Sequence, residues 1–505
     1  MLFSTPIHYP MQRCARRSFL FLCVVLVLFA QFGIHVEAAP SSKSTSSKKS
    51  SLKLFQQLRH PSAAVRLKAV LSLAKLGVKA RPYFMTLSVM MKTDTSQDVR
   101  FAAGAVCSLI LLREGKLAVG LLRSLSSPSR ETRWMAIHGL ASSGPKAIPG
   151  LRKALQHKNA KVRSGAAKAL GMMGRPGGPA VPRLIHLLKD SSWEVRSAAA
   201  EALGQIRLYP KQVVPALIPL LNDSFLVASP AATALGHYKG KAASAVPTLL
   251  RLLAKPNCHP CTTVAMTLGY IGPAALPLML QRLKTTRSVQ ELTGLLGAFG
   301  KMKQRAAPVI KNVVQLLLHP NKDVRSAAAM AIWDINVPNA QAVNALRKTM
   351  KDSDEYVRAN SARALSSMGK QAAIALPELR HALHDSSFWV VREAIVAIGK
   401  IGKKAAPAIP QLLRVLRQSP SVYARQNAAQ ALGRMGCPTK SAANGLLAAL
   451  QDKSSWVRHW AVDALLTCKA KKKRVIAAVK RLLHDSDPSV VRSARKALRA
   501  WRAIP

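Results

Sequence analysis

Two cysteines, Cys258 and Cys261, form a C-x-x-C motif within the segment NCHPC. This spacing suits dithiol redox chemistry, but that chemistry normally needs a βαβ context, which the surrounding sequence does not provide. A single C-x-x-C is also a weak zinc signal, because a structural zinc ion needs four ligands. We therefore expect a local disulfide, formed after export, and no catalytic or metal-binding role for this pair.

The 13 histidines do not form a catalytic or metal-binding set with other residues. His60, His157 and His319 occupy the same position in separate copies of a repeated segment, too far apart to share a metal ion. We interpret them as turn residues. No Ser-His-Asp set, phosphate-binding loop or paired-carboxylate motif stands out, so the sequence predicts no catalytic, cofactor-binding or metal-binding site.

Positive charge is the strongest chemical feature of the chain. Its 76 Lys and Arg residues face only 22 Asp and Glu residues, which gives a formal net charge of +54. Such a surface attracts polyanions over roughly a Debye length, so an anionic partner is expected. Charge alone does not distinguish an acidic protein, an anionic envelope surface and nucleic acid.

Many basic residues lie in short loops that recur about every 33 residues. If equivalent loops lie side by side, they form one positively charged edge, which we call the basic ridge and which would bind an anionic partner. A solvated edge that only keeps the protein soluble is the alternative. The basic ridge comprises Lys79, Arg81, Lys146, Arg175, Lys239, Lys241, Lys301, Lys303, Arg305, Lys370, Lys400, Lys403, Lys404, Arg434, Lys440, Lys471, Lys472 and Lys473.

The elements that would position these loops are repeats. One pattern recurs from residue 52 to 505, for example SSWEVRSAAAEALGQI from Ser191 and DEYVRANSARALSSMG from Asp354. Alignment on its arginine gives fourteen units, in which this position is occupied by Arg66, Arg100, Arg133, Arg163, Arg196, Ala228, Cys261, Val289, Arg325, Arg358, Arg392, Arg425, Arg458 and Arg492.

Each unit has room for two short helices. In the second helix, Val195, Ala199 and Leu203 lie at i, i+4 and i+8 and form one apolar stripe. Aspartates such as Asp190 and Asp352 mark the turn before that helix. Glycine eleven residues after the repeated arginine suits a left-handed helix end, and it is found at Gly77, Gly144, Gly174, Gly272, Gly300, Gly369 and Gly436.

This pattern resembles the HEAT-repeat superfamily, in particular its short bilin-lyase-like repeats. The resemblance covers residues 52–505 and implies an all-α, armadillo-like superhelix whose second helices line the concave face. The superfamily also includes enzymes. A bilin-lyase-like or hydroxylase-like enzyme, or an enzyme accessory, is therefore an alternative function for this chain. The related deoxyhypusine hydroxylase binds iron through His-Glu dipeptides, and this chain has none.

The eleven repeated arginines are interpreted as a structural ladder, each beside the turn aspartate of its own unit. The column five residues later, which includes Leu71, Lys168 and Arg363, is mixed in character. A uniformly basic groove is therefore not expected. Residues 209–300 depart from the pattern and are interpreted as repeat drift, with a hinge or an apolar docking patch as the alternative.

The N-terminus predicts export. Arg13, Arg16 and Arg17 precede a short apolar run, and small residues around Ala38 suit signal cleavage, with an uncleaved membrane anchor as the alternative. Residues 1–38 are thus a predicted signal peptide and 39–51 a Ser/Lys-rich linker, with no membrane span after cleavage. We expect an exported scaffold, periplasmic, envelope-bound or secreted, whose basic ridge binds an acidic protein partner or an anionic envelope surface. Nucleic-acid binding is the second alternative.

Overall fold

The computed structural model describes residues 54–76, 80, 82–113, 117–256, 258, 260–470 and 472–504. Within these ranges all regular secondary structure is helical. The predicted signal peptide and linker, and Lys79, Arg81 and Lys471 of the basic ridge, lie outside the described residues. The chain divides into two compact units, Met1–Gly177 and Gly178–Pro505, each considered by itself.

The first unit contains the α-helices α3 to α9, which follow the predicted repeat. These are α3 (Ala63–Leu76), α4 (Phe84–Thr93), α5 (Gln97–Arg113), α6 (Leu117–Ser124), α7 (Arg130–Ser142), α8 (Ile148–Ala154) and α9 (Ala160–Met173).

The second unit contains ten described helix pairs. Their first helices are α10 (Val181–Leu187), α12 (Pro210–Leu217), α14 (Val246–Leu253), α16 (Leu276–Thr285), α18 (Ile310–Gln315), α20 (Ala340–Thr349), α22 (Leu376–His381), α24 (Ile409–Gln418), α26 (Lys440–Ala449) and α28 (Lys473–Arg481). Their second helices are α11 (Trp193–Ile206), α13 (Phe225–Tyr238), α15 (Cys261–Ile271), α17 (Val289–Met302), α19 (Lys322–Ile335), α21 (Glu355–Met368), α23 (Phe388–Ile401), α25 (Val422–Arg434), α27 (Ser455–Thr467) and α29 (Pro488–Ala500).

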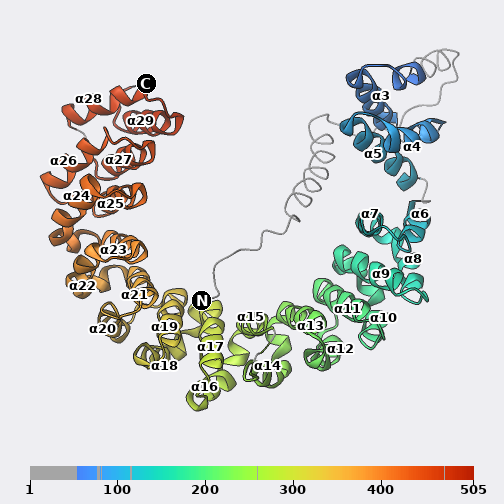
Figure 1. Ribbon diagram of the computed structural model, residues 1–505, viewed down its shortest axis with the longest axis horizontal. Coiled ribbons are helices and arrows are strands. Elements are labelled where there is room, and N and C mark those ends of the chain that lie inside the picture. Colours follow the sequence, from blue (N-terminus) through green and yellow to red (C-terminus); the bar gives the residue numbers. More distant parts are fainter. Residues whose placement is uncertain are drawn as a thin grey trace. The chain divides into compact units, whose positions relative to one another are not determined.

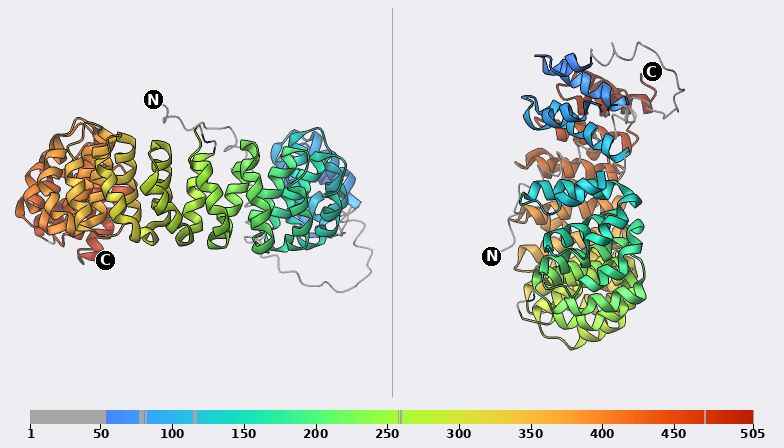
Figure 2. Two further views of the ribbon diagram at one scale, coloured as in Figure 1. Left: turned by 90° about the horizontal axis from the view of Figure 1, so that it is seen from below. Right: turned by 90° about the vertical axis from the view of Figure 1, so that its right-hand side faces the viewer.

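The second helices provide most of the core. In α11 the predicted stripe residues Val195, Ala199 and Leu203 are completely buried. A lone helix pair cannot bury such a stripe, so stability comes from stacking of neighbouring repeats. Within Gly178–Pro505 the pairs stack along a curve, with the second helices on its inner, concave side and the first helices outside (Figure 1). Figure 2 shows that these helices run across the direction of stacking.

Short 3-10 turns connect consecutive repeats. In Gly178–Pro505 they include η5 (Lys239–Ala245), η7 (Lys303–Val309), η9 (Gly369–Ala375) and η11 (Gly402–Ala408). Proline occupies the first turn of several first helices, where its missing N–H costs nothing. The loops that carry the basic ridge are therefore compact, regular turns.

Left-handed residues end the second helices, as predicted, although not always at glycine. Gly144, Gly174, Gly272, Gly369 and Gly436 have positive φ, whereas Arg207, Lys239, Lys303 and Asn336 fill the same role elsewhere. The prediction for Gly300 is wrong, because Gly300 lies inside α17, which ends at Met302. A Cβ atom there would lie only 3.0 Å from Asp334 Oδ2 of the next second helix.

The structure also corrects the alignment in four repeats. The repeated arginine lies four residues after the helix N-cap and donates its backbone N–H to that residue, as Arg358 does to the carbonyl of Asp354. In these repeats the equivalent hydrogen bonds are made by Val264, Leu292, Val391 and Val491. Cys261, Val289, Arg392 and Arg492 are therefore out of register, and nine arginines, not eleven, occupy this position among the described repeats.

One described stretch, Cys261–Thr285, has the length and apolar composition of a membrane span. The structure divides it into α15, the turn η6 (Gly272–Ala275) and α16, with a left-handed break at Gly272. Half of its apolar window is buried within the fold. Its hydropathy is thus that of a core segment of the solenoid.

Candidate binding surfaces

The repeated arginine links consecutive repeats. Arg196 donates from Nη1 to the carbonyls of Asp190 and Ser191 in its own turn, at 2.8 and 3.0 Å. Its Nε and Nη2 donate to both carboxylate oxygens of Asp223, in the turn of the next repeat, at 2.7 and 2.9 Å. One planar guanidinium therefore ties two neighbouring turns together in a bidentate arrangement.

This arrangement, which we call the arginine ladder, recurs along both units. Each turn aspartate also accepts the backbone N–H of a residue that follows it, as Asp385 does from Ser387 at 2.8 Å. The described pairs are Arg66–Asp94, Arg196–Asp223, Arg325–Asp352, Arg358–Asp385, Arg425–Asp452 and Arg458–Asp485. The structural role of the arginines is confirmed, and Arg196, Arg358 and Arg458 do lie beside the aspartate of their own turn, whose backbone carbonyl they contact. The carboxylate that each described arginine pairs with, however, belongs to the next repeat.

The ladder sets the electrostatics of its edge. The hydrogen bond from Arg66 holds the pKa of Asp94 below its ordinary value, and Arg458 does the same for Asp485. The ladder arginines are mostly buried and occupied by these contacts. They are thus unavailable to an external polyanion, whichever partner the protein binds.

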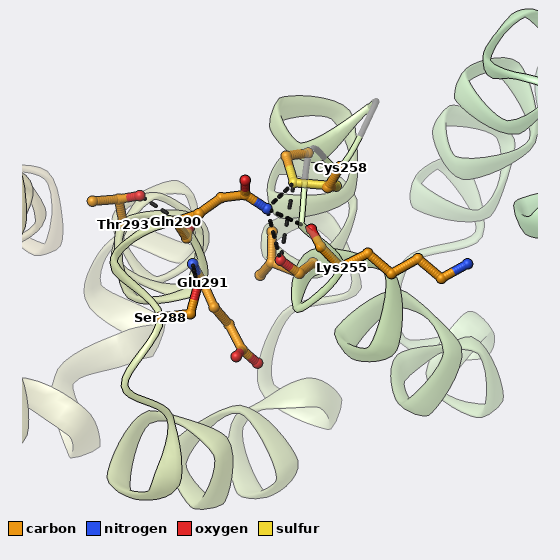
Figure 3. The surroundings of a disulfide bond; sticks show 8 residues. Lys255, Cys258, Ser288, Gln290, Glu291 and Thr293 are labelled. Atoms are coloured by element: carbon orange, nitrogen blue, oxygen red, sulfur yellow. Dashed lines mark hydrogen bonds between the residues drawn. A yellow bond between two sulfur atoms is a disulfide. The ribbon is translucent and has the colours of Figure 1, made fainter.

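The divergent middle repeats replace the ladder with other polar contacts. Gln290 at the start of α17 donates from Nε2 to the carbonyls of Leu253 and Lys255 in the preceding repeat, at 3.3 and 2.9 Å (Figure 3). The same amide contacts Cys261 Sγ at 3.3 Å, and Cys261 is joined to Cys258 in a disulfide. This cysteine pair therefore lies in a structural bridge between two repeats, as a disulfide and not as a metal site.

The predicted turn histidines have the role assigned to them. His60 Nδ1, His157 Nδ1 and His319 Nδ1 each accept a backbone N–H two residues later, at 3.1, 3.0 and 3.1 Å. Across the described ranges, no group of three or more His, Cys, Asp or Glu side chains could hold a metal ion.

A Ser, a His and an Asp do meet on α27 and α29, which the sequence did not indicate. Ser493 Oγ lies 2.9 Å from His459 Nδ1 and 3.4 Å from Asp463 Oδ1. The carboxylate contacts the serine, whereas a catalytic triad needs it on the imidazole. Ser493 is also only 4% exposed. The three residues form a polar contact between neighbouring helices and not a hydrolytic site.

Two further cysteines form a disulfide that the sequence analysis missed. Cys437 follows α25 and Cys468 caps α27, and the structure joins them across adjacent repeats. Their separation of 31 residues, close to one repeat, was the available signal. Cys107 is buried and free, and burial raises the pKa of its thiol to about 11, so it is not a reactive nucleophile.

The described basic ridge is exposed in both units. Lys146 and Arg175 lie at the repeat junctions of the first unit. In the second unit its described members lie at the ends of α17, α23 and α25, in η5, η7, η9 and η11, and at the starts of α26 and α28, and all are exposed. Lys301 lies over the ring of Tyr270, and Lys400 donates to Ser366 Oγ. None of the described ridge side chains takes part in an ion pair, in contrast to the ladder at the opposite helix ends.

Acidic residues gather at those opposite ends. Asp352, Asp385, Asp452 and Asp485 all belong to turns before second helices, where the ladder arginines neutralise them. Near the described ridge, Asp334 lies at the end of α19, and Glu378 in the first turn of α22 is paired with Arg347. The two edges of the second unit therefore differ in charge, and the ridge edge retains its positive charge.

The concave face carries a row of exposed aromatic side chains that the sequence analysis did not identify. They lie on the first turns of α21, α23, α25 and α27, in four consecutive repeats. We call this row the aromatic strip, and its members with their exposed fractions are Tyr356 (61%), Phe388 (37%), Trp389 (48%), Tyr423 (65%) and Trp456 (62%).

Arginines accompany the aromatic strip. Arg392, displaced by one residue from the ladder, lies over the ring of Trp389 at 4.7 Å from its centroid. Its Nη2 donates to Oε1 of the buried Glu393, which also accepts from Arg363 Nη2 at 2.8 Å. Burial alone would raise the pKa of Glu393, but these two hydrogen bonds outweigh it and hold the pKa below its ordinary value.

Comparison with known proteins supports the architecture. The family model for HEAT repeats matches residues 118–180, 177–229, 310–399 and 409–499, together more than half of the chain. A search of curated proteins gave no match.

Solved structures show the same fold at low sequence identity. A crystal structure of importin beta matches with a TM-score of 0.51 and 15% identity over 91% of this chain and 75% of that one. Kap95p, whose structure is described in terms of its binding to RanGDP, matches with a TM-score of 0.56 and 15% identity over 91% of this chain and 66% of that one. At this identity the likeness concerns the fold alone.

Proposed function

We propose that this chain, which belongs to the HEAT-repeat family, is an exported protein-binding scaffold whose basic ridge binds an acidic partner protein. A HEAT-repeat solenoid is suited to protein–protein interaction because stacked repeats present long, regular surfaces. The N-terminal basic and apolar segments of the sequence support the export part of the proposal.

The observation that carries the acidic partner is the contrast between the two edges. The ladder arginines are bound to aspartates, whereas the described ridge residues are exposed and have no ion-pair partner. Exposed charges of one sign raise the local concentration of the opposite charge and accelerate association. An acidic protein surface would supply the missing carboxylates.

The test is the binding of poly-glutamate to the full chain at increasing salt. Because exposed charges are screened within about 8 Å at physiological ionic strength, affinity should fall as salt rises. The double variant Lys403→Glu, Lys404→Glu in η11 should bind more weakly than the control variant Lys311→Glu, Lys348→Glu. The control makes the same change of charge on the exposed faces of first helices.

An equal loss of poly-glutamate affinity in the two double variants would show that net charge alone attracts the ligand, and it would refute the ridge as the binding surface. An affinity for poly-glutamate that does not change with salt would also refute it. Preference for anionic lipid vesicles over poly-glutamate, with the same dependence on Lys403 and Lys404, would assign the ridge to an envelope surface instead.

A further inference from the structure

The aromatic strip combines apolar surface with unused hydrogen-bond donors. Large aromatic residues and arginine are the residue types most often responsible for binding energy at protein interfaces. Tyr356, Tyr423 and Trp456 are each more than half exposed, so their rings are not needed to complete the core. These side chains form an apolar surface that a partner could cover.

The two arginines in the strip share a single carboxylate partner, Glu393. A guanidinium has five N–H donors, yet Arg363 and Arg392 each donate one described hydrogen bond, both to the same oxygen of Glu393. Two positive charges thus share one buried carboxylate. Arg392 lies over the ring of Trp389, and this contact fixes the position of its guanidinium. The remaining N–H donors of Arg392 are therefore oriented to bind a second carboxylate.

The spacing of the strip indicates the conformation of its ligand. Packed helices lie about 8–10 Å apart, so equivalent side chains of consecutive repeats recur at about that interval. A polyproline-type segment advances about 3.1 Å per residue with three residues per turn, or about 9 Å per turn. Every third side chain of such a segment would meet the next aromatic residue of the strip.

We propose that the aromatic strip binds an extended, acidic segment of a partner protein, with an apolar side chain at every third residue and a carboxylate bound by Arg392. Grooves lined with aromatic residues recognise extended, proline-rich segments in this way because the ligand is ordered before it binds. The inference rests on the proposed function as a protein-binding scaffold and adds a second contact, on the concave face.

A single-stranded nucleic acid could also stack on aromatic rings. Glu355, however, is exposed next to Tyr356 and, unlike the ladder aspartates, has no described ion pair. A phosphate at every nucleotide would pass this carboxylate, whereas a peptide can place its carboxylate at Arg392 alone. The charge distribution therefore favours the peptide.

Selection of a displayed library of random twelve-residue peptides on the full chain tests this inference. We expect enriched peptides to carry Asp or Glu and to repeat proline or an aromatic residue at every third position. A fluorescein-labelled copy of the most enriched peptide should bind Trp389→Ala and Arg392→Gln at least about tenfold more weakly than the unchanged protein. Trp193→Ala, on the first turn of α11, should bind normally.

Several results would overturn the inference. Enriched peptides that are basic, or that bind Trp389→Ala with unchanged affinity, would exclude the proposed ligand chemistry. Displacement of the peptide by an oligothymidine that itself requires Trp389 would assign the strip to nucleic acid. Far-UV circular dichroism should show unchanged helicity in each variant, because Trp389 and Trp193 are nearly half exposed.

The ridge variant separates this inference from the proposed function. Lys403→Glu, Lys404→Glu should weaken poly-glutamate binding but leave binding of the selected peptide within about twofold, since the strip lies at the other ends of the helices. If poly-glutamate does not bind through the ridge although the selected peptide binds the strip, the proposed function is refuted. If the peptide does not bind through the strip although poly-glutamate binds the ridge, only this inference is refuted.

Discussion

Replacing Arg358 with alanine removes a complete step of the arginine ladder. Arg358 donates to both oxygens of Asp385 at 2.7 and 2.9 Å and to the carbonyls of Asp352 and Ser353 at 2.8 and 3.0 Å. In the variant, Asp385 keeps the backbone N–H of Ser387 as a donor but loses its counter-charge. The contact between α21 and α23 should therefore weaken.

The magnitude follows from the burial of the pair. The Arg358 and Asp385 side chains are only 16% and 12% exposed, and breaking such a pair leaves one charge without compensation. Removal of one partner of a buried pair costs about 3–5 kcal/mol. Because Asp385 retains one hydrogen bond and some solvent, we expect about 3 kcal/mol for Arg358→Ala. A double-mutant cycle with Asp385→Ala should give a coupling of about 2 kcal/mol.

Amide hydrogen exchange is the appropriate measurement, because repeat arrays depart from two-state unfolding. A loss of about 3 kcal/mol should accelerate exchange in α21 and α23 by about a hundredfold, with little change in distant repeats. Arg392→Ala is the matched control, since Glu393 keeps Arg363, and it should cost less than about 1 kcal/mol. Equal effects of the two variants, or a coupling near zero, would refute the ladder as a link between repeats.

Three more predictions concern the stability of the repeats. The ladder aspartates have pKa values below their ordinary value of 3.8. The stabilisation that they provide is therefore present above that pH and is lost as pH falls through the lowered values. Acid titration of helicity should show this loss, and a flat profile would contradict it. Gly433→Ala should destabilise by about 1–3 kcal/mol in urea unfolding because its Cβ would lie 2.7 Å from Ala464, whereas Gly297→Ala, with nothing within 4 Å, should stabilise by about 0.5–1 kcal/mol. Replacing Cys437 and Cys468 with alanine should lower the stability of the C-terminal repeats by up to about 3–4 kcal/mol, and a reductant should affect the unchanged protein but not this variant.

The architecture was predictable because the repeat is encoded locally and many times. An apolar stripe such as Val195, Ala199 and Leu203 fixes the buried face of a helix whatever its neighbours are. The alignment errors arose in repeats where the residue chosen by its type is not the fourth residue after the helix N-cap. In FWVVREA, two consecutive valines precede the arginine, and only the N-cap at Ser387 shows that Val391, not Arg392, occupies the ladder position.

The partner of each ladder arginine depended on information that one repeat does not contain. Arg196, Arg358 and Arg458 each have two candidate aspartates, one six residues before the arginine and one 27 residues after it, and spacing does not choose between them. The structure assigns the carbonyls of the earlier turn to Nη1 of Arg196 and the later carboxylate, Asp223, to Nε and Nη2. A guanidinium is long and planar enough to serve both turns at once.

The aromatic strip was within reach of the sequence. The concave column five residues after the ladder position repeats one helical face, and moving back seven residues along that face reaches Tyr356, Tyr423 and Trp456. Searching the loops alone for aromatic residues overlooked this row. The place of Arg392 beside the strip is harder to predict, because alignment of the sequence puts this residue in the arginine ladder.

The charge separation links the stability of the repeats to their surface chemistry. Acidic residues such as Asp385 and Asp452 lie where one carboxylate can hold two turns together, and each forms an ion pair with a ladder arginine. Few acidic residues remain for the other helix ends, so Lys403 and Lys404 stay exposed and unpaired. The same distribution of carboxylates therefore stabilises one edge of the stack and leaves the opposite edge free to attract an anionic partner.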